Sequence, residues 1–289
     1  MSRTSKDHSD KRIVGRPFLR WAGGKSRIVR HLIEFLPEEP FREYWEPFLG
    51  AGALFFALAP RRAHLSDSNS EMISCFRAIR DRPDLVFRYL REHLPKTSKE
   101  YYYQIRQLYN RSGPSIAQAA RFLYLNRAGF NGIYRVNRKG EYNVPYGHKE
   151  PPPAPSREDL QLASRLLRNA SLSSCPYEIA LTRNGPRPSD FVYLDPPYPP
   201  LNETSNFTHY TTSRFSWKDQ ENVAQLANEI RNRNCFVMVS NSDVERVRGL
   251  YSGWHIHTLP VTRWIAANGS RYAVAELVAT SYPVIRKGE

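Results

Sequence analysis

The chain has 289 residues, 40% of them hydrophobic, and it carries a formal net charge of +14 at pH 7. This length suits one large domain or two modest ones, and the sequence contains no run of about 18 apolar residues, so we expect no membrane-spanning helix. The three cysteines (Cys75, Cys175 and Cys235) form no C-x-x-C pair and are odd in number, which argues against a zinc site and a disulfide framework and favours a reducing cytoplasm.

The first predicted element follows a polar N-terminus. Residues 1–16 contain no apolar core of a secretory signal, and we expect them to be disordered. Residues 27–36 place apolar side chains at helical spacing and predict a short amphipathic helix. Pro37 and Pro40 follow directly and end the pattern, because proline lacks the amide hydrogen that a helix needs.

A turn that contains two glycines comes next in the chain. Gly50 and Gly52 precede a predicted helix over residues 53–59, and a predicted strand over residues 63–67 ends in Asp67. Glycines let a backbone approach a ligand closely, and in open α/β folds an acid after the second strand accepts hydrogen bonds from ribose hydroxyls. The pattern favours a ligand with an adenosine ribose. It does not separate a nicotinamide cofactor from S-adenosylmethionine, although the missing third glycine argues against the dinucleotide fingerprint.

The middle of the chain is predicted to be mainly helical. Residues 131–147 are the exception, because turn-forming Asn-Gly and Lys-Gly pairs separate short β-prone runs and predict a hairpin or an ordered loop. Residues 151–155, four of which are proline, form a stiff connector and a candidate domain boundary. Apolar patterns at helical spacing run through residues 72–79, 85–94, 101–109 and 116–125.

This middle region is also basic. Residues 71–150 contain 15 Lys and Arg against 7 Asp and Glu, together with 13 aromatic residues. Cations bind phosphates and aromatic rings stack on bases, so the mixture fits a nucleic-acid surface. Many proteins are basic without binding nucleic acid, and charge alone supports this interpretation only weakly.

The second half of the chain alternates helices with strands. Such alternation in both flanks predicts an α/β sheet covered by helices on both faces, into which the helical middle is inserted. The predicted elements are a helix over residues 157–170, a strand over 191–194, a helix from the N-cap Ser216 to about residue 232, a strand over 235–240 and two strands flanking Asn268 and Gly269.

The strand over residues 191–194 runs into Asp195-Pro196-Pro197-Tyr198. Two prolines fix the backbone after a buried strand and remove two amide donors. The carbonyls and the Asp195 carboxylate would then form a corner that is rich in acceptors and poor in donors, with an aromatic ring beside it. Such a corner suits the amino group of a planar base, because the acceptors bind its two N–H hydrogens while Tyr198 stacks on the ring.

These acceptors would draw the amino lone pair out of conjugation, so that the nitrogen can attack an electrophilic methyl group in line with a sulfonium leaving group. Positioning and electrostatics supply most of such catalysis, because no covalent intermediate is needed. No cysteine lies near either motif in the sequence, which argues against thiol-dependent methylation of cytosine carbon 5. The competing interpretation is an ordinary turn that ends a strand, and the upstream Phe-x-Gly-x-Gly at residues 48–52 weakens it.

Taken together, these motifs resemble the D12-class, Dam-type adenine DNA methyltransferases over about residues 17–280. The resemblance implies a Rossmann-like, S-adenosylmethionine-dependent methyltransferase core of residues 17–69 and 155–289. A mainly helical target-recognition domain with a β-hairpin, residues 70–154, would be inserted after the second strand. The segments that carry the resemblance are residues 17–25 (PFLRWAGGK), 46–52 (EPFLGAG), 122–132 (FLYLNRAGFNG), 140–147 (GEYNVPYG), 195–198 (DPPY) and 205–208 (SNFT).

The resemblance also implies the site residues and the reaction, which is methyl transfer to the exocyclic amino group of adenine. No metal is expected. From the residues alone, Trp21 and Lys25 would have been taken for a buried tryptophan and a solvated lysine. The expected catalytic residues are Asp195, Pro196, Pro197 and Tyr198. The residues expected to bind S-adenosylmethionine are Trp21, Lys25, Glu46, Phe48, Gly50, Gly52, Asp67 and Asp195.

Duplex DNA is the implied partner, with a flipped target adenine and GATC as the recognised sequence. Arg135 is the best candidate for reading guanine, because a guanidinium matches the guanine edge in the major groove, whereas most basic residues contact only phosphates. Phe130 or Tyr134 could wedge into the base stack. His148 departs from the GATC-specific pattern, which has Arg after this turn, so one base contact is expected to differ. The residues expected to contact DNA are Arg127, Phe130, Asn131, Ile133, Tyr134, Arg135, Arg138, Lys139, Pro145 and His148.

Two alternatives stay open at this point. A related enzyme could use the same turn to methylate RNA or the exocyclic amine of cytosine, but Asp at the first position of the turn and the size of the middle region favour adenine in DNA. A DNA-binding regulator could keep the fold without activity, but every polar catalytic position is present. We expect a cytoplasmic, DNA-associated protein with no membrane attachment and no obligatory protein partner.

Overall fold

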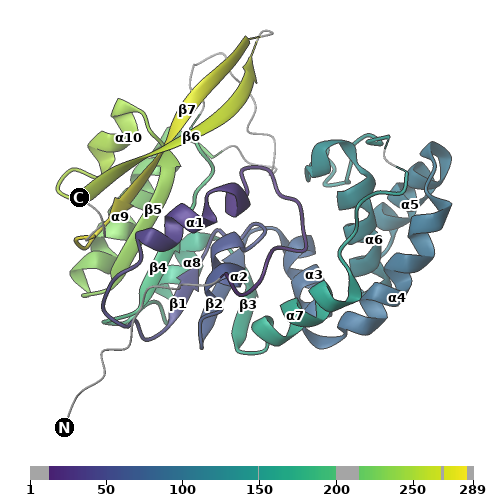
Figure 1. The fold of residues 1–289 in the computed structure, drawn as a ribbon, viewed down its shortest axis with the longest axis horizontal. Helices are drawn as coiled ribbons and strands as arrows, with labels where there is room; N and C mark the ends of the chain where they lie inside the picture. The colour runs from purple at the N-terminus through teal and green to yellow at the C-terminus, as the bar shows by residue number, and fades with distance from the viewer. Residues whose placement is uncertain (1–12, 149, 200–214, 268–269, 285–289) are drawn as a thin grey trace.

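The described chain forms a seven-stranded sheet flanked by helices, and a further group of helices lies beside one edge of that sheet (Figure 1). The computed structural model describes residues 13–148, 150–199, 215–267 and 270–284. Within these ranges, no helix is both long and apolar enough to cross a bilayer. Two sequence predictions lie outside them, namely the 205–208 motif and the turn at Asn268 and Gly269, as do residues 1–12 of the segment 1–16 that was expected to be disordered. The expectation of disorder is wrong for Val14 and Gly15, because their amides donate to the carbonyl oxygens of Ala57 and Phe56 at 3.2 Å and 2.9 Å.

The sheet has the strand order β3-β2-β1-β4-β5-β7-β6. Neighbouring strands from β3 to β5 are parallel, whereas β7 runs antiparallel to both β5 and β6. Parallel neighbours require crossover connections, which here contain helices, and the predicted Rossmann-like α/β fold is confirmed. The strands are β1 (Tyr44–Glu46), β2 (Ala63–Asp67), β3 (Ala170–Ser174), β4 (Phe191–Leu194), β5 (Phe236–Ser242), β6 (His255–Ala267) and β7 (Ser270–Thr280).

Two hydrophobic cores cover the two faces of the sheet. Alternate residues of a strand point to opposite faces, so Phe191 and Tyr193 belong to one core whereas Val192 and Leu194 belong to the other. The first core includes side chains from α1, α2, α3 and α7, and the second includes side chains from α8, α9 and α10. These helices are α1 (Val29–Glu34), α2 (Ala53–Leu58), α3 (Ser70–Asp81), α7 (Arg157–Leu167), α8 (Tyr177–Thr182), α9 (Trp217–Asn232) and α10 (Glu245–Leu250).

Local signals explain where two of these helices begin or end. The predicted N-cap Ser216 is confirmed, because it accepts a hydrogen bond from the Asp219 amide and forms a reciprocal capping box at the start of α9. The helix predicted over residues 27–36 is shorter than expected. A 3-10 turn precedes α1, and the helix ends at Glu34, ahead of Pro37.

The helical middle is built around α6, which contacts α3, α4 and α5. α3 contacts β2 and β3, and α7 contacts β3, so these two helices connect the group to the edge of the sheet (Figure 1). All four helices predicted between residues 70 and 130 are present. Besides α3, they are α4 (Pro83–His93), α5 (Lys99–Arg111) and α6 (Ile116–Ala128).

The aromatic residues of this region are mostly core rather than surface. Of the 13 aromatic residues at 71–150, Phe130 alone is exposed, at 50%. Buried rings cannot stack on bases, so the interpretation of this region's aromatics as a nucleic-acid surface is wrong for the eight that pack inside. Tyr109 and Tyr142, for example, meet edge to face with their centroids 5.9 Å apart. The eight are Phe76, Tyr102, Tyr109, Phe122, Tyr124, Tyr134, Tyr142 and Tyr146.

Residues 129–147 form an ordered loop with hairpin-like pairing. Isolated bridges join Gly129 to Tyr146 and Val136 to Tyr142, without a regular strand in this segment. Beyond the inner bridge, the amide of Asn137 donates to the carbonyl oxygen of Glu141 at 2.9 Å and closes a tight turn. The structure therefore matches the ordered-loop form of the prediction. The expected β-hairpin is reduced to two single bridges.

Candidate active site

The chain direction across the sheet reverses at β1. From β1 the chain runs outward to β2 and β3, and it then returns to β4 on the other side of β1. In open α/β sheets, ligands bind at this switch point, beyond the carboxyl ends of the two strands. β1 ends at Glu46 and leads into the glycine turn, while its parallel neighbour β4 ends at Leu194 and leads into Asp195. Both motifs identified in the sequence therefore leave the same edge of the sheet from adjacent strands (Figure 1).

Glycine is required at both positions of the turn after β1. Gly50 and Gly52 have φ angles of +48° and +69°, in the left-handed region that side chains disfavour. A Cβ atom on Gly50 would lie 2.9 Å from Cδ1 of Trp21, so the indole packs directly on the turn. The same indole stacks on Tyr134, with ring centroids 5.7 Å apart. Trp21 thus lies on the glycine turn, where the cofactor is expected to bind, and it contacts the 129–147 loop through Tyr134.

Asp67 ends β2, as predicted, and also shapes the glycine turn. Its Oδ2 accepts a hydrogen bond from the Gly50 amide at 3.0 Å, and its Oδ1 accepts one from the Asn69 amide at 2.9 Å. Burial raises the pKa of the carboxyl group, although both hydrogen bonds act in the opposite direction. A carboxylate can accept about four hydrogen bonds, so these two donors leave capacity for ribose hydroxyls.

A cysteine does lie near this part of the site. The amide of Cys175 donates to the carbonyl oxygen of Asp67 at 3.2 Å, which places a cysteine beside Asp67 although the two residues are far apart in the chain. Strand pairing between β2 and β3 brings the two residues together. Burial raises the pKa of the Cys175 thiol and disfavours the thiolate. A protonated thiol is a poor nucleophile, and Cys175 is bonded here through its backbone amide.

Glu46, the last residue of β1, is a buried acid. Its Oε2 accepts a hydrogen bond from the hydroxyl of Tyr44 at 2.8 Å. Burial raises the pKa of Glu46 to about 8, and the negative charges of Asp195 and Asp67 act in the same direction. Glu46 is therefore largely protonated at neutral pH, in a region where three carboxyl groups converge.

Asp195 is held by side chains from distant parts of the chain. The Nζ atom of Lys25 lies 2.7 Å from its Oδ2 and 2.5 Å from its Oδ1, and Oγ of Ser240 donates to Oδ1 at 2.8 Å. Ser240 also bonds to the hydroxyl of Tyr193 at 2.8 Å. Lys25 is only 4% exposed and donates to the carbonyl oxygen of Gly23 at 3.0 Å. It is thus a buried ion-pair partner rather than a solvated lysine.

Further donors reach the backbone of the turn. Nε2 of Gln220 donates to the carbonyl oxygen of Pro197 at 2.6 Å, and Nδ2 of Asn241 donates to Oε1 of Gln220 at 3.0 Å. The corner is rich in acceptors, as predicted, but the expectation that it is poor in donors is wrong. Chain order shows only local donors, whereas the fold brings Lys25, Ser240 and Gln220 to the turn.

Tyr198 completes the turn and contacts a residue that the sequence did not reveal. The Nζ atom of Lys25 lies 4.7 Å from the centroid of the Tyr198 ring, and the Tyr198 hydroxyl donates to Oε1 of Glu276 on β7. Glu276 is 0% exposed, and its Oε1 is 3.7 Å from Nζ of Lys25. One signal could have identified it, namely a single carboxylate within the otherwise apolar residues 273–279.

Phe48 differs from the other expected cofactor residues. Its ring packs against Tyr177, with centroids 5.0 Å apart, and against Phe215 at 6.1 Å, within the second hydrophobic core. Its packing therefore accounts for an aromatic residue at this position. The structure does bring Trp21 and Asp67 to the glycine turn, while Lys25 and Asp195 form an ion pair.

The residues expected to contact DNA separate into an exposed set and a partly buried set. Tyr134 is 9% exposed and lies against Trp21, which leaves Phe130 as the ring that faces solvent. Ile133 is half-buried. The exposed set is Phe130, Asn131, Arg138, Lys139, Pro145 and His148.

The other two arginines among the expected DNA contacts, Arg127 and Arg135, are held in different ways. A guanidinium nitrogen of Arg127 donates to the carbonyl oxygen of Phe18, and burial lowers the pKa of Arg127 to about 10. Nε and Nη2 of Arg135 donate to the side-chain and main-chain oxygens of Asn143 at 2.8 Å and 3.0 Å. Arg127 thus connects internal segments, whereas Arg135 is oriented within the loop.

Asn126 joins the loop to the segment that precedes Trp21. Its Oδ1 accepts a hydrogen bond from the Arg20 amide at 2.9 Å, and its Nδ2 donates to the carbonyl oxygens of Arg20 and Gly132 at 2.8 Å and 3.1 Å. The sequence alone did not indicate this role for Asn126. Its buried amide fixes the expected cofactor segment and the expected DNA loop to each other.

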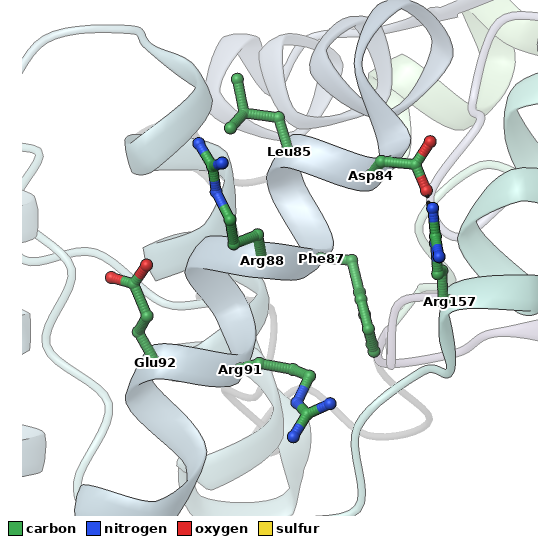
Figure 2. A pocket seen from close by; sticks show the side chains of 7 residues that line it. All are labelled: Asp84, Leu85, Phe87, Arg88, Arg91, Glu92 and Arg157. Atoms are coloured by element: carbon green, nitrogen blue, oxygen red, sulfur yellow. Dashed lines mark hydrogen bonds and ion pairs between the residues drawn. The ribbon is translucent and has the colours of Figure 1, made fainter.

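An open hollow of about 690 Å³ lies elsewhere, along α4 and at the start of α7 (Figure 2). Asp84 and Arg157 point toward each other at one side of it, with Nε of Arg157 at 2.7 Å from the carboxylate. Its charged side chains are all exposed, and none belongs to the motifs above, so it is not the candidate site. The lining residues are Asp84, Leu85, Phe87, Arg88, Arg91, Glu92 and Arg157.

The chain is similar to known proteins over most of its length. The Type II methyltransferase M1.LlaDCHI of Lactococcus lactis subsp. cremoris is 39% identical, over 92% of this chain and 95% of the relative. The Type II methyltransferase M.MjaIII of Methanocaldococcus jannaschii is 34% identical, over 92% of this chain and 99% of the relative. The DNA adenine methylase of Escherichia coli K12 is 37% identical, over 93% of this chain and 96% of the relative.

The family model described as D12 class N6 adenine-specific DNA methyltransferase matches residues 21–265. This match contains the glycine turn, Asp67 and the turn that begins at Asp195. Among the described residues, no cluster of His, Cys, Asp and Glu side chains could hold a metal ion. The chain belongs to the D12 class N6 adenine-specific DNA methyltransferase family and is an adenine-specific DNA methyltransferase.

Proposed function

We propose that this enzyme transfers the methyl group of S-adenosylmethionine to the exocyclic amino nitrogen of adenine in double-stranded DNA. The observation that carries the proposal is the position of Asp195 at the carboxyl end of β4, next to the strand that leads into the glycine turn. A site for an adenosine-containing methyl donor thereby adjoins a turn that accepts hydrogen bonds from an amino group.

The residues around the glycine turn fit S-adenosylmethionine. This molecule carries a sulfonium and an α-amino cation, and the carboxyl groups of Glu46, Asp67 and Asp195 converge on the region. Asp67 keeps acceptor capacity for ribose hydroxyls, and the half-buried Trp21 offers an aromatic face at the turn. When bound there, S-adenosylmethionine would supply an electrophilic methyl group.

The protein's own residues would orient the nucleophile. Asp195 accepts a hydrogen bond from the adenine amino group and makes its lone pair more available. The nitrogen would form a bond to the methyl carbon as the carbon–sulfur bond breaks, S-adenosylhomocysteine would leave, and the proton lost from the nitrogen would pass to water. Lys25 and Ser240 already hold the Asp195 carboxylate, so little reorganisation is needed when the base arrives.

The target adenine must leave the double helix to reach Asp195, because its amino group is otherwise paired and stacked inside the duplex. Tyr198 supplies a ring for the flipped base beside the carboxylate. Phe130, which is 50% exposed on the 129–147 loop, is suited to fill the gap that the base leaves in the stack.

We further propose that residues 70–154 form the target-recognition domain and that the target is GATC. Support comes from the resemblance of residues 122–132 and 140–147 to Dam-type enzymes and from exposed basic residues on the loop. Arg135, oriented by Asn143, is the candidate reader of one guanine. His148 stands where the GATC-specific pattern has Arg, so a variant of GATC is the alternative target.

One assay tests the function. Purified enzyme is incubated with tritiated S-adenosylmethionine and a GATC duplex, a scrambled duplex, a GATC duplex already methylated at both adenines, or a structured RNA. We expect label on the first substrate alone, recovered as N6-methyladenine. Label on RNA or on cytosine would support the alternatives left open by the sequence. The absence of label on all of these substrates and on a long duplex of mixed sequence, which contains the variants of GATC, would contradict the proposed function.

A further inference from the structure

Glu276 is a buried carboxylate on the central strand of the antiparallel part of the sheet. It lies on β7, opposite Ser242 of β5 and Leu259 of β6. It is 0% exposed, and the residues that follow it, Leu277 and Val278, are apolar and also buried. Burying a carboxylate costs free energy unless charges and hydrogen bonds compensate, so the partners of Glu276 decide what it does.

Those partners belong to the Asp195 turn. Oε1 of Glu276 accepts a hydrogen bond from the Tyr198 hydroxyl and lies 3.7 Å from Nζ of Lys25. The same ammonium is 2.7 Å from Oδ2 of Asp195 and 4.7 Å from the centroid of the Tyr198 ring. Four side chains from distant segments therefore form one network around the turn, and Glu276 contacts two of the other three.

We propose that Glu276 is a positioning residue for methyl transfer, which holds the Tyr198 ring in the orientation that stacks on the target adenine and holds Lys25 against Asp195. This role rests on the proposed function, because it presumes that Tyr198 and Asp195 receive the base. Glu276 acts through Tyr198 and Lys25 and not on the reacting atoms.

The physical reason lies in how a tyrosine ring is held. Its Cβ fixes one end of the ring, and the hydrogen bond to Glu276 fixes the hydroxyl at the other end. An in-line transfer is sensitive to such placement, because a displacement of about 1 Å can slow a reaction by roughly a hundredfold. The negative charge of Glu276 also gives Lys25 a second anionic neighbour and so stabilises the ammonium in the interior.

Two variants test this role, each with a matched control. Glu276→Gln keeps the shape of the side chain and removes its charge, and Tyr198→Phe keeps the ring and removes its hydroxyl. Glu43→Gln is the matched charge removal, at a carboxylate that pairs with His64 ahead of β1, away from the Asp195 turn. Tyr282→Phe removes a buried hydroxyl that donates to a backbone carbonyl at 2.9 Å elsewhere in the protein.

We expect Glu276→Gln and Tyr198→Phe each to lower kcat on a GATC duplex by roughly tenfold to a hundredfold. The DNA dissociation constant should change by no more than about twofold, because positioning affects the transition state more than binding. The double variant should lose less than the product of the two single losses, because both changes act on one contact. Glu276→Gln weakens it by removing the charge of the acceptor, and Tyr198→Phe removes the donor. A 2-aminopurine at the target position should fluoresce more brightly in both variants, because a less constrained ring stacks less well. Both controls should keep the wild-type kcat.

An unchanged kcat in folded Tyr198→Phe enzyme would overturn the proposal, and this variant decides the matter alone if Glu276→Gln does not fold. Single losses that multiply in the double variant would also overturn it, as would losses confined to melting temperature. The proposed function fails separately, if wild-type enzyme labels no adenine. Normal labelling by the wild type together with unaffected variants would remove only the role of Glu276.

Discussion

The Asp195 turn and the loop of residues 129–147 are stabilised in opposite ways. At the turn, buried side chains such as Lys25, Ser240 and Gln220 bond to the functional groups themselves. In the loop, most of the candidate DNA contacts are exposed, and order comes from backbone pairing and from Asn126 beneath it. Catalysis requires groups that are oriented before the substrate arrives, whereas reading DNA requires side chains that are open to the grooves.

This contrast predicts that substitutions at the turn act mainly on the chemical step, and substitutions in the loop act mainly on sequence discrimination. The largest effect is expected for Asp195→Ala. Loss of the acceptor should reduce kcat by on the order of a thousandfold or more, while DNA binding largely survives.

Single-turnover methylation measures the Asp195→Ala effect, and Asp84→Ala is the matched control. Asp84 is exposed, pairs with Arg157 and lies along the hollow on α4, so its loss should leave kcat unchanged. An Asp195→Ala enzyme within tenfold of wild-type turnover would break the distinction between the two regions.

A smaller effect is expected at Asp67. Asp67→Ala should weaken S-adenosylmethionine binding by about 1.5–3 kcal/mol, because a charge-assisted hydrogen bond to ribose is lost. Chemistry at saturating cofactor should slow less than binding weakens. Asp67→Asn keeps an acceptor for the Gly50 amide, so its affinity for S-adenosylmethionine should lie between those of the wild type and Asp67→Ala. Calorimetric titration measures the affinities, and an unchanged affinity in Asp67→Ala would refute the assignment.

In the loop, Arg135→Ala should reduce discrimination at one guanine by about 1–3 kcal/mol. Lys139→Ala, at an exposed position on the same loop, should instead weaken binding to all sequences and reduce its salt dependence. Competition binding against duplexes with single-base changes separates the two outcomes. Uniform weakening by Arg135→Ala would assign Arg135 to the phosphates as well.

The smallest effect is a dependence of cofactor affinity on pH. The pKa of Glu46 is raised to about 8 in the protein without cofactor. Its contribution to the free energy of unfolding is therefore fully present below its ordinary pKa of about 4.5. That contribution is lost as the pH rises through 8. A cationic cofactor should favour ionised Glu46, lower its pKa and release a proton, so affinity should increase from pH 6 toward pH 8.

Calorimetry in two buffers of different ionisation enthalpy measures the proton released on cofactor binding. Glu46→Gln should abolish both the release and the pH dependence of affinity. Equal dependence in the wild type and in this variant would place the titrating group elsewhere.

The sequence predicted elements better than it predicted contacts. β2 and β4 were predictable because each is a short β-prone run next to an acid. β2 ends at Asp67, and Asp195 directly follows the last residue of β4. The partners of these acids were not, because Ser240 and Glu276 reach the turn only through the pairing of β4 with β5 and of β5 with β7. Tyr134 shows the same limit, since an aromatic residue in a basic segment looks the same whether it faces DNA or packs on an indole.

The most direct test of the account is base-resolution mapping of methylation in plasmid from cells that lack their own adenine methyltransferases and express either the wild type or Asp195→Ala. We expect N6-methyladenine at GATC on both strands with the wild-type enzyme and none with the variant. Methylation of another atom, or methylation that persists in Asp195→Ala, would contradict the assignment of Asp195 as the group that receives the adenine amino nitrogen.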